Sequence, residues 1–290
     1  MRDPFITRTI QLILLLAAAG AVAAAADTQT DNQPFPPHRI AANLYYVGAS
    51  DIAVYLVTTP AGDILINEGY ESTPPLIRDS IAKLGFRLSD VKILLNSQAH
   101  FDHVAGLHEM QRLTGAKVYS SQREVAVLES GGKADTRWGR EQTYPPVKVD
   151  HVVRDLEEVT LGGTRLVAHM TPGHSIGCTT WTMRVADGGR TYNVVIVGGV
   201  SINPGVNLID HPNYPGIADD FAHTFQVLRS LDCDIFLGAH GGYYGMKAKY
   251  DRLKAGAKDN PFVDPAGYRA FIDGAEKTFE EQLAREKAAR

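Results

Sequence analysis

Short apolar runs alternate with segments of helical spacing along this chain, and the alternation occurs twice. The first half predicts strands over residues 44–47, 53–57, 64–66, 91–95 and 118–120. It also predicts helices over residues 74–84, 104–113 and 122–128. The second half predicts strands over 158–161, 166–170, 179–185, 192–197 and 235–238, with helices over 218–231 and 265–289. Two such halves favour an α/β fold in which two sheets pack together and the helices lie outside.

The first 26 residues have the order of a secretory signal peptide. Arg2 and Arg8 precede an apolar run from Ile10 to Ala26, and the run closes in small residues just before Asp27. This run is shorter than the ~20 residues that a membrane span needs, although a retained membrane anchor is the alternative. We therefore predict cleavage after residue 26, export to the periplasm and no stable membrane association of the mature chain.

The remaining chain divides into a short lead-in and one domain. Residues 27–39 are polar and Pro-rich, which predicts a flexible N-terminal segment. No low-complexity linker interrupts residues 40–290, so we expect a single domain there. Two cysteines, Cys178 and Cys233, either form a disulfide, which an oxidising compartment permits, or remain separate buried thiols.

The overall composition is that of a globular protein, with 44% hydrophobic and 21% charged residues. The formal net charge of −4 and the lack of a long basic stretch argue against a nucleic-acid partner. The sequence gives no indication of the oligomeric state.

A dense cluster of polar side chains directly follows the predicted strand over residues 91–95. Within six positions it holds Gln98, His100, Asp102 and His103. Imidazole and carboxylate groups are good zinc ligands, and alternate spacing lets residues 98, 100 and 102 project to one side. The alternative is an ordinary polar loop in which Asp102 caps the following helix.

Two further histidines also follow predicted strands. His174 lies in the run Thr-Pro-Gly-His-Ser-Ile-Gly-Cys over residues 171–178, and His240 lies in Leu-Gly-Ala-His-Gly-Gly over residues 237–242. Small neighbours allow a close approach to a metal ion. Each run alone fits an ordinary turn histidine, but three histidine-bearing loops at strand ends together indicate a metal centre.

The order of these motifs resembles the metallo-β-lactamase superfamily, whose first motif is usually His-x-His-x-Asp-His. The details are most similar to subclass B3, including Gly177 to Trp181 (Gly-Cys-Thr-Thr-Trp) and Asn203 to Gly205 (Asn-Pro-Gly). The resemblance extends from about Ile40 to the C-terminus. It implies a four-layer αβ/βα sandwich with up to two Zn²⁺ ions at one edge.

The resemblance also implies a ligand set. The first zinc would be held by Gln98, His100 and His174, and the second by Asp102, His103 and His240. Gln98 departs from the histidine that the family usually has, although a glutamine variant of this subclass exists. An amide oxygen is a weaker zinc donor than imidazole, so we predict that the first site is the weaker one.

A second departure is Asn67, which stands where the family commonly carries an aspartate at the end of a strand. In the family that residue often supports the metal loop from behind. Asn67 could still orient a ligand, as a neutral partner, or it could be a simple turn residue.

The resemblance predicts zinc-dependent hydrolysis of the β-lactam ring of penicillins, cephalosporins and carbapenems by metal-bound hydroxide. Asp102 would be the catalytic residue that orients the nucleophile. Ser201 and Asn203 are candidates to meet the substrate carboxylate, although both also fit a turn ahead of Pro204. Tyr243 and Tyr244 are candidates for a pocket wall or for core packing.

Two other functions stay open at this point. Lactonases, thioesterases and phosphodiesterases share the metal framework, and a fold does not settle its substrate. The other alternative is a periplasmic zinc-binding protein without catalysis, because Gln98 weakens one site.

Overall fold

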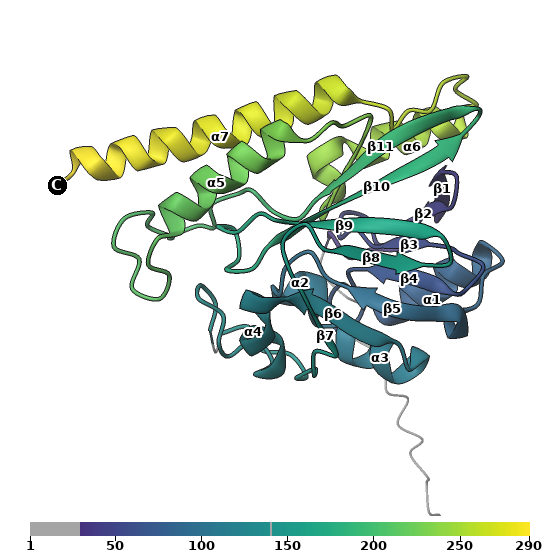
Figure 1. Cartoon of the computed structure of the whole chain (residues 1–290), viewed down its shortest axis with the longest axis horizontal. Coiled ribbons are helices and arrows are strands. Elements are labelled where there is room, and N and C mark those ends of the chain that lie inside the picture. The colour runs from purple at the N-terminus through teal and green to yellow at the C-terminus, as the bar shows by residue number, and fades with distance from the viewer. Residues whose placement is uncertain (1–29, 140) are drawn as a thin grey trace, which may run out of the picture.

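The computed structural model describes residues 30–139 and 141–290. Two β-sheets lie face to face in the middle of the molecule, and helices cover the outer face of each (Figure 1). This is the predicted four-layer αβ/βα sandwich. The predicted signal peptide over residues 1–26 lies outside the described residues.

The first sheet has seven strands in the order of the chain. They are β1 (His38–Ala41), β2 (Leu44–Tyr46), β3 (Tyr55–Val57), β4 (Asp63–Ile66), β5 (Val91–Leu95), β6 (Lys117–Ser121) and β7 (His151–Val153). Strands β1 to β4 pair antiparallel, and β4 to β7 pair parallel. The parallel strands β4 and β5 end together, because Ile66 pairs with Leu95.

The second sheet has five strands in the order β12-β11-β10-β9-β8. Their bounds are β8 (Glu158–Leu161), β9 (Thr164–Met170), β10 (Thr179–Asp187), β11 (Arg190–Val197) and β12 (Ile235–Gly238). Among the strands of this sheet that the structure describes, β11 and β12 pair parallel and the others antiparallel, and β11 and β12 end together at Val197 and Gly238. The loops that follow these two strands therefore leave the sheet side by side.

The helices form the two outer layers, and Figure 1 shows α5 and α7 on the side of the second sheet and α1, α3 and α4 on the side of the first. The helices are α1 (Pro74–Lys83), α2 (Phe101–Val104), α3 (Leu107–Thr114), α4 (Val125–Glu129), α5 (Ile217–Ser230), α6 (Met246–Lys254) and α7 (Pro265–Ala288). One hydrophobic cluster lies between the sheets and extends under α5 and α7, and a second fills the space between the first sheet and its helices.

Hydrogen bonds join the two sheets at the edge where β5 and β12 end. Trp181, fully buried on β10, donates its indole N–H to the carbonyl of Asn96 at 3.0 Å. The hydroxyl of Tyr55 on β3 donates to the carbonyl of Gly238 at 2.7 Å. These bonds fix the strand ends of one sheet against those of the other, so the loops beyond them can share a site.

The structure departs from the sequence expectations at a few elements. The helix predicted over residues 104–113 is two helices, α2 and α3, separated at Gly106. A Cβ added there would lie 2.5 Å from the carbonyl oxygen of Glu68, so only glycine fits at this close approach. Strands β1 and β7 and helix α6 were not predicted.

The Pro-rich lead-in is described from residue 30 and contacts the domain. The backbone N–H groups of Ser50 and Asp51 donate to the carbonyls of Gln33 and Asp31, each at 2.8 Å. Strand β1 begins at His38, two residues before the domain boundary that we predict at residue 40. From residue 30 on, the segment that we expected to be flexible is therefore hydrogen-bonded to the loop between β2 and β3.

Cys178 and Cys233 are both free thiols. Cys178 is buried just before β10, and Cys233 is half-buried just before β12. Among the described residues, no helix has the length and apolar character to cross a bilayer.

Candidate metal centre

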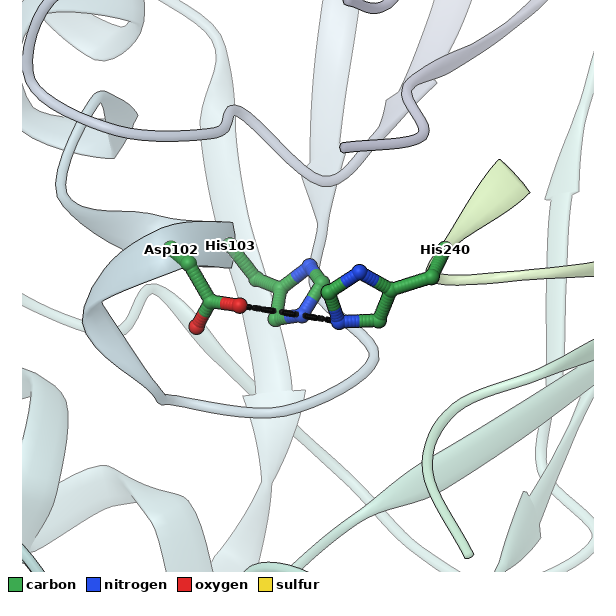
Figure 2. Close-up of side chains that lie close together, drawn as sticks. All are labelled: Asp102, His103 and His240. Atoms are coloured by element: carbon green, nitrogen blue, oxygen red, sulfur yellow. Dashed lines mark hydrogen bonds and ion pairs between the residues drawn. The ribbon is translucent and has the colours of Figure 1, made fainter. Parts of the chain in front are cut away.

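Three of the predicted ligands converge from two sheets. Asp102 and His103 lie on the short helix α2, which follows β5, and His240 follows β12. Each offers one donor atom, and these atoms all lie within 4.8 Å of one another. Figure 2 shows the Asp102 carboxylate and the His240 ring pointing toward the His103 ring. The Nε2 atoms of the two histidines are 3.2 Å apart, and Asp102 Oδ2 lies 3.2 Å from His103 Nε2 and 3.6 Å from His240 Nε2.

Asp51 holds the far side of the His240 ring. Its Oδ2 lies 3.0 Å from His240 Nδ1, and its Oδ1 accepts a hydrogen bond from the Gly242 N–H at 2.7 Å. Burial opposes ionisation of Asp51, but the hydrogen bond and charge of His240 outweigh it, so the pKa of this carboxyl is lowered. An ionised Asp51 fixes the proton of His240 on Nδ1, which leaves the Nε2 lone pair facing Asp102 and His103.

Of the other three predicted ligands, two histidines lie together, and Gln98 is anchored to the loop that follows β11. The rings of His100 and His174 lie 4.8 Å apart, edge to face. Gln98 is fully buried, and its Nε2 donates to the carbonyl of Gly198 at 3.2 Å. Its Oε1 is buried without a hydrogen-bond partner. Because a buried oxygen rarely lacks a partner, this atom fits the role of a donor to a cation.

His100 and His174 are also held from behind. His174 Nδ1 lies 2.7 Å from the carbonyl oxygen of Ser201. His100 Nε2 lies 3.5 Å from Oδ2 of Asp135, a buried carboxylate in the loop before β7. The backbone also fits closely here, because a Cβ at Gly199 would lie 2.5 Å from Cδ2 of His174. These contacts leave Nδ1 of His100 and Nε2 of His174 as the free nitrogens.

The charge states of the group suit metal binding. Burial lowers the pKa of His100 to about 4 and that of His174 to about 3, so both rings are neutral at neutral pH. Burial opposes ionisation of Asp102, but its interactions with His103 and His240, which include a hydrogen bond from His103, outweigh it and hold the pKa of that carboxyl well below its usual value. The neutral rings of His100 and His174 and the ionised carboxylate of Asp102 are donors that suit a divalent zinc ion. Burial lowers the pKa of His240, but the hydrogen bond and charge of Asp51 and the charge of Asp102 outweigh it, so the pKa of this ring is raised.

Asn67 is a supporting residue rather than a simple turn. It is fully buried directly after β4 and adopts a left-handed backbone conformation, with φ 66°. Its Oδ1 accepts a hydrogen bond from the N–H of Ser97 at 2.8 Å. Since Ser97 precedes Gln98, the neutral amide of Asn67 fixes the start of the loop that carries four of the six predicted ligands.

The residues that we predicted to contact the substrate or to line its pocket have different surroundings in the structure. Ser201 is exposed beside the centre, with its Oγ 3.2 Å from His174 Nδ1. The carbonyl of Asn203 accepts a hydrogen bond from the N–H of Val206 at 3.1 Å, which is the turn contact that Pro204 and Gly205 suggest. Tyr243 lies against His240, with ring centroids 5.1 Å apart. Tyr244 is buried in the core, where its hydroxyl oxygen accepts a hydrogen bond from the hydroxyl of Tyr55.

Sequence reasoning did not find Asp51 or Asp135. Both lie in irregular loops, and neither belongs to a motif with recognisable spacing. An acidic residue that ends buried against a histidine looks, in sequence, like any loop aspartate.

The larger hollows of the described surface lie away from these residues. One of about 630 Å³ lies over β9, β10 and β11, and one of about 540 Å³ lies beside residues 58–63. Neither is lined by any of the six predicted ligands. The chemistry of the site therefore rests on the converging side chains and not on the size of a cavity.

Comparisons with known proteins show the family of this chain. The family model of the metallo-β-lactamase superfamily matches residues 47–240. The native FEZ-1 metallo-β-lactamase from Legionella gormanii is 48% identical, with a TM-score of 0.87, over 88% of this chain and 98% of that chain. BJP-1, a subclass B3 metallo-β-lactamase of Bradyrhizobium japonicum, is 38% identical, with a TM-score of 0.83, over 90% and 98%. A Bacillus subtilis protein described as a probable metallo-hydrolase is 31% identical over 57% of this chain and 71% of its own length.

The fold and the comparisons define a zinc-dependent hydrolase with a two-sheet sandwich. The chain belongs to the metallo-β-lactamase superfamily, and subclass B3 enzymes are among the solved structures that resemble it.

Proposed function

We propose that this hydrolase opens the β-lactam ring of penicillins, cephalosporins and carbapenems. The observation that carries the proposal is the converging donor set, in a chain that is 48% identical to a solved metallo-β-lactamase over nearly its whole length. The curated sequence relatives are metal-dependent hydrolases of other description, so the comparison of solved structures supports the substrate class and the curated relatives do not.

In this proposal, Asp102, His103 and His240 hold one zinc ion, and Gln98, His100 and His174 hold the other. The facing Nε2 atoms of His103 and His240 support the zinc site at Asp102, because two ring nitrogens at 3.2 Å need a proton or a cation between them. The unpartnered Oε1 of Gln98 supports the other zinc site. A neutral amide donor in place of an imidazole makes the Gln98 site the weaker of the two.

Bound zinc lowers the pKa of water toward neutrality and polarises a carbonyl group. The residues of the chain supply orientation. Asp102 Oδ2 faces His103 and His240, so the ionised carboxylate is placed to orient the attacking water. The hydroxyl of Ser201, exposed beside His174, is placed to donate to the carboxylate of the substrate. Asn203 is the second candidate for that contact, because the turn bond uses its backbone carbonyl and not its side-chain amide.

The test is hydrolysis of a carbapenem and a cephalosporin by the mature chain, from Asp27 onward. Activity should disappear with a chelator and return with zinc. Absence of turnover by a folded, zinc-loaded sample would contradict the proposal, and lactone, thioester and phosphodiester substrates would then be compared. Zinc binding without turnover of any of them would favour the non-catalytic alternative.

Location is part of the same proposal, since a periplasmic enzyme meets β-lactams before they reach their targets. The signal-peptide pattern over residues 1–26 supports export. Fractionation of cells that express the full chain, followed by mass determination of the secreted form, should find a periplasmic protein that begins at Asp27. A full-length product in the membrane fraction would support the retained anchor.

A further inference from the structure

A hollow of about 430 Å³ lies between α7 and the loop that follows β11. It adjoins both halves of the candidate metal centre. Ser201 lines it, and the Oγ of this residue is 3.2 Å from Nδ1 of His174. Tyr243 also lines it, and its ring packs against His240 at 5.1 Å. The hollow therefore begins where the predicted ligands end.

Most of the wall of the hollow is apolar. Val200 and Ile202 come from the loop, and Phe271 on α7 packs against Tyr243 with ring centroids 4.9 Å apart. No charged side chain is among its described lining residues. The polar groups are hydroxyls, and the one beside the centre is that of Ser201, which hydrogen-bonds Tyr243. Beyond Ser201, toward Phe271 and α7, an uncharged, apolar group fits this chemistry.

Helix α7 leaves the space open because its side chains here are small. Ala270, Gly274 and Thr278 recur every four residues and therefore share one face of the helix. A Cβ added at Gly274 would meet no atom within 4 Å. The open volume of the hollow at this point thus depends on the absence of a side chain at Gly274.

We propose that this hollow binds an apolar aromatic substituent of the β-lactam substrate, and that Gly274 sets the size it accepts. The proposal rests on the proposed function. With the substrate carboxylate at Ser201, a substituent on the same molecule can extend past Tyr243 toward α7. Burial of an aromatic ring between Tyr243 and Phe271 would tighten binding without touching the reacting bond. It would lower KM and leave kcat unchanged.

The test compares Gly274→Leu with wild type on two substrates. One is a penicillin with a benzyl side chain, and the other is the parent penicillin nucleus that lacks it. Leucine at residue 274 fills the hollow, so KM for the benzyl substrate should rise about tenfold. KM for the nucleus and kcat for both should stay within about twofold of wild type. Replacing glycine in a helix interior favours the helix, so the variant should fold.

Two further variants keep the comparison decisive. Ala284→Leu adds the same side chain to an exposed position of α7 outside the hollow, and should change neither KM. Thr278→Leu fills the hollow from the next turn and should reproduce the selective KM rise if Gly274→Leu folds poorly. Thermal unfolding and zinc content of all three variants should match wild type.

The outcomes separate the two proposals. If Gly274→Leu leaves both KM values unchanged, or raises both equally, the hollow is not the subsite and the β-lactamase proposal stands. If wild type hydrolyses neither substrate, the proposed function fails, and the subsite proposal fails with it.

Discussion

His103 Nε2 and His240 Nε2 lie 3.2 Å apart, although 137 positions separate them along the chain. His103 follows a strand of the first sheet, and His240 follows a strand of the second. Because Nδ1 of His240 is bonded to Asp51, its Nε2 lone pair faces His103. A cation between these nitrogens would link the two halves of the sandwich and relieve the repulsion of their lone pairs. Metal binding and fold stability should therefore be coupled.

The first prediction concerns that coupling. Zinc added to metal-free protein should raise the free energy of unfolding by about 4 kcal/mol at a thousandfold excess over Kd. Asp102→Asn removes the charge but keeps the shape, so most of this gain should be lost, and hydrolysis should fall by about two orders of magnitude or more. Thermal and urea unfolding with and without zinc measure the effect. Equal zinc stabilisation of Asp102→Asn and wild type would contradict the assignment of this residue.

The second prediction concerns Asp51. Asp51→Asn removes the carboxylate that orients His240, so zinc affinity at the site of Asp102, His103 and His240 should fall by about 10- to 100-fold. The turn should stay intact, because the amide oxygen can still accept from Gly242 N–H. Competition with a chromophoric chelator gives the affinity directly, without an activity assay. Asp259→Asn, on an exposed loop, is the matched control. A loss of the same size in that control would rule out orientation of His240 as the cause.

The third prediction concerns Gln98. Gln98→His replaces a neutral amide oxygen with an imidazole, which is the better zinc donor, so the weaker of two binding steps should tighten by about tenfold or more. The stronger step, through Asp102, should move little. Calorimetric titration of metal-free wild type and variant would resolve the two steps. Two binding steps of equal affinity in wild type would show that the amide of Gln98 does not weaken the site that it shares with His100 and His174.

Much of the fold could be predicted from the sequence, and so could the side chains that the structure brings together at one edge of the sandwich. The strand-end histidines carry a local signal, because each follows an apolar run and stands beside small residues. The aspartates that contact these histidines carry no such local signal in the sequence. Asp51 and Asp135 are loop aspartates whose roles depend on contacts with His240 and His100, far away in the chain.

The missed elements have similar physical reasons. Strand β1 was not predicted because the nearby Pro34, Pro36 and Pro37 suggest disorder. In the structure the strand begins directly after these prolines and lies at the edge of the first sheet, where proline is tolerated. Helix α6 has the sequence Met-Lys-Ala-Lys-Tyr-Asp-Arg-Leu-Lys, in which charged residues obscure an apolar stripe. Its burial depends on Met246, which contacts residues from elsewhere in the core.

The fourth prediction concerns Glu124, which lies behind the His174 loop. Its carboxylate accepts hydrogen bonds from the Ser175 hydroxyl and, at 3.2 Å, from the Gly177 N–H. Burial nevertheless raises the pKa of Glu124 to about 7 from an ordinary value of 4.5. Between these two pH values the folded protein binds more protons at this residue than the unfolded chain does. The contribution of Glu124 to the free energy of unfolding is therefore fully present below pH 4.5 and is lost as the pH rises to about 7.

Glu124→Gln removes this titration while keeping the size of the side chain. One pKa unit corresponds to about 1.4 kcal/mol, so wild type should lose up to about 3 kcal/mol relative to the variant between pH 4.5 and pH 7. Urea unfolding of the metal-free proteins at several pH values measures the difference, because bound zinc would add its own pH dependence. The exposed substitution Glu280→Gln should show no such divergence. A constant offset between Glu124→Gln and wild type across this range would mean that Glu124 keeps an ordinary pKa despite its burial.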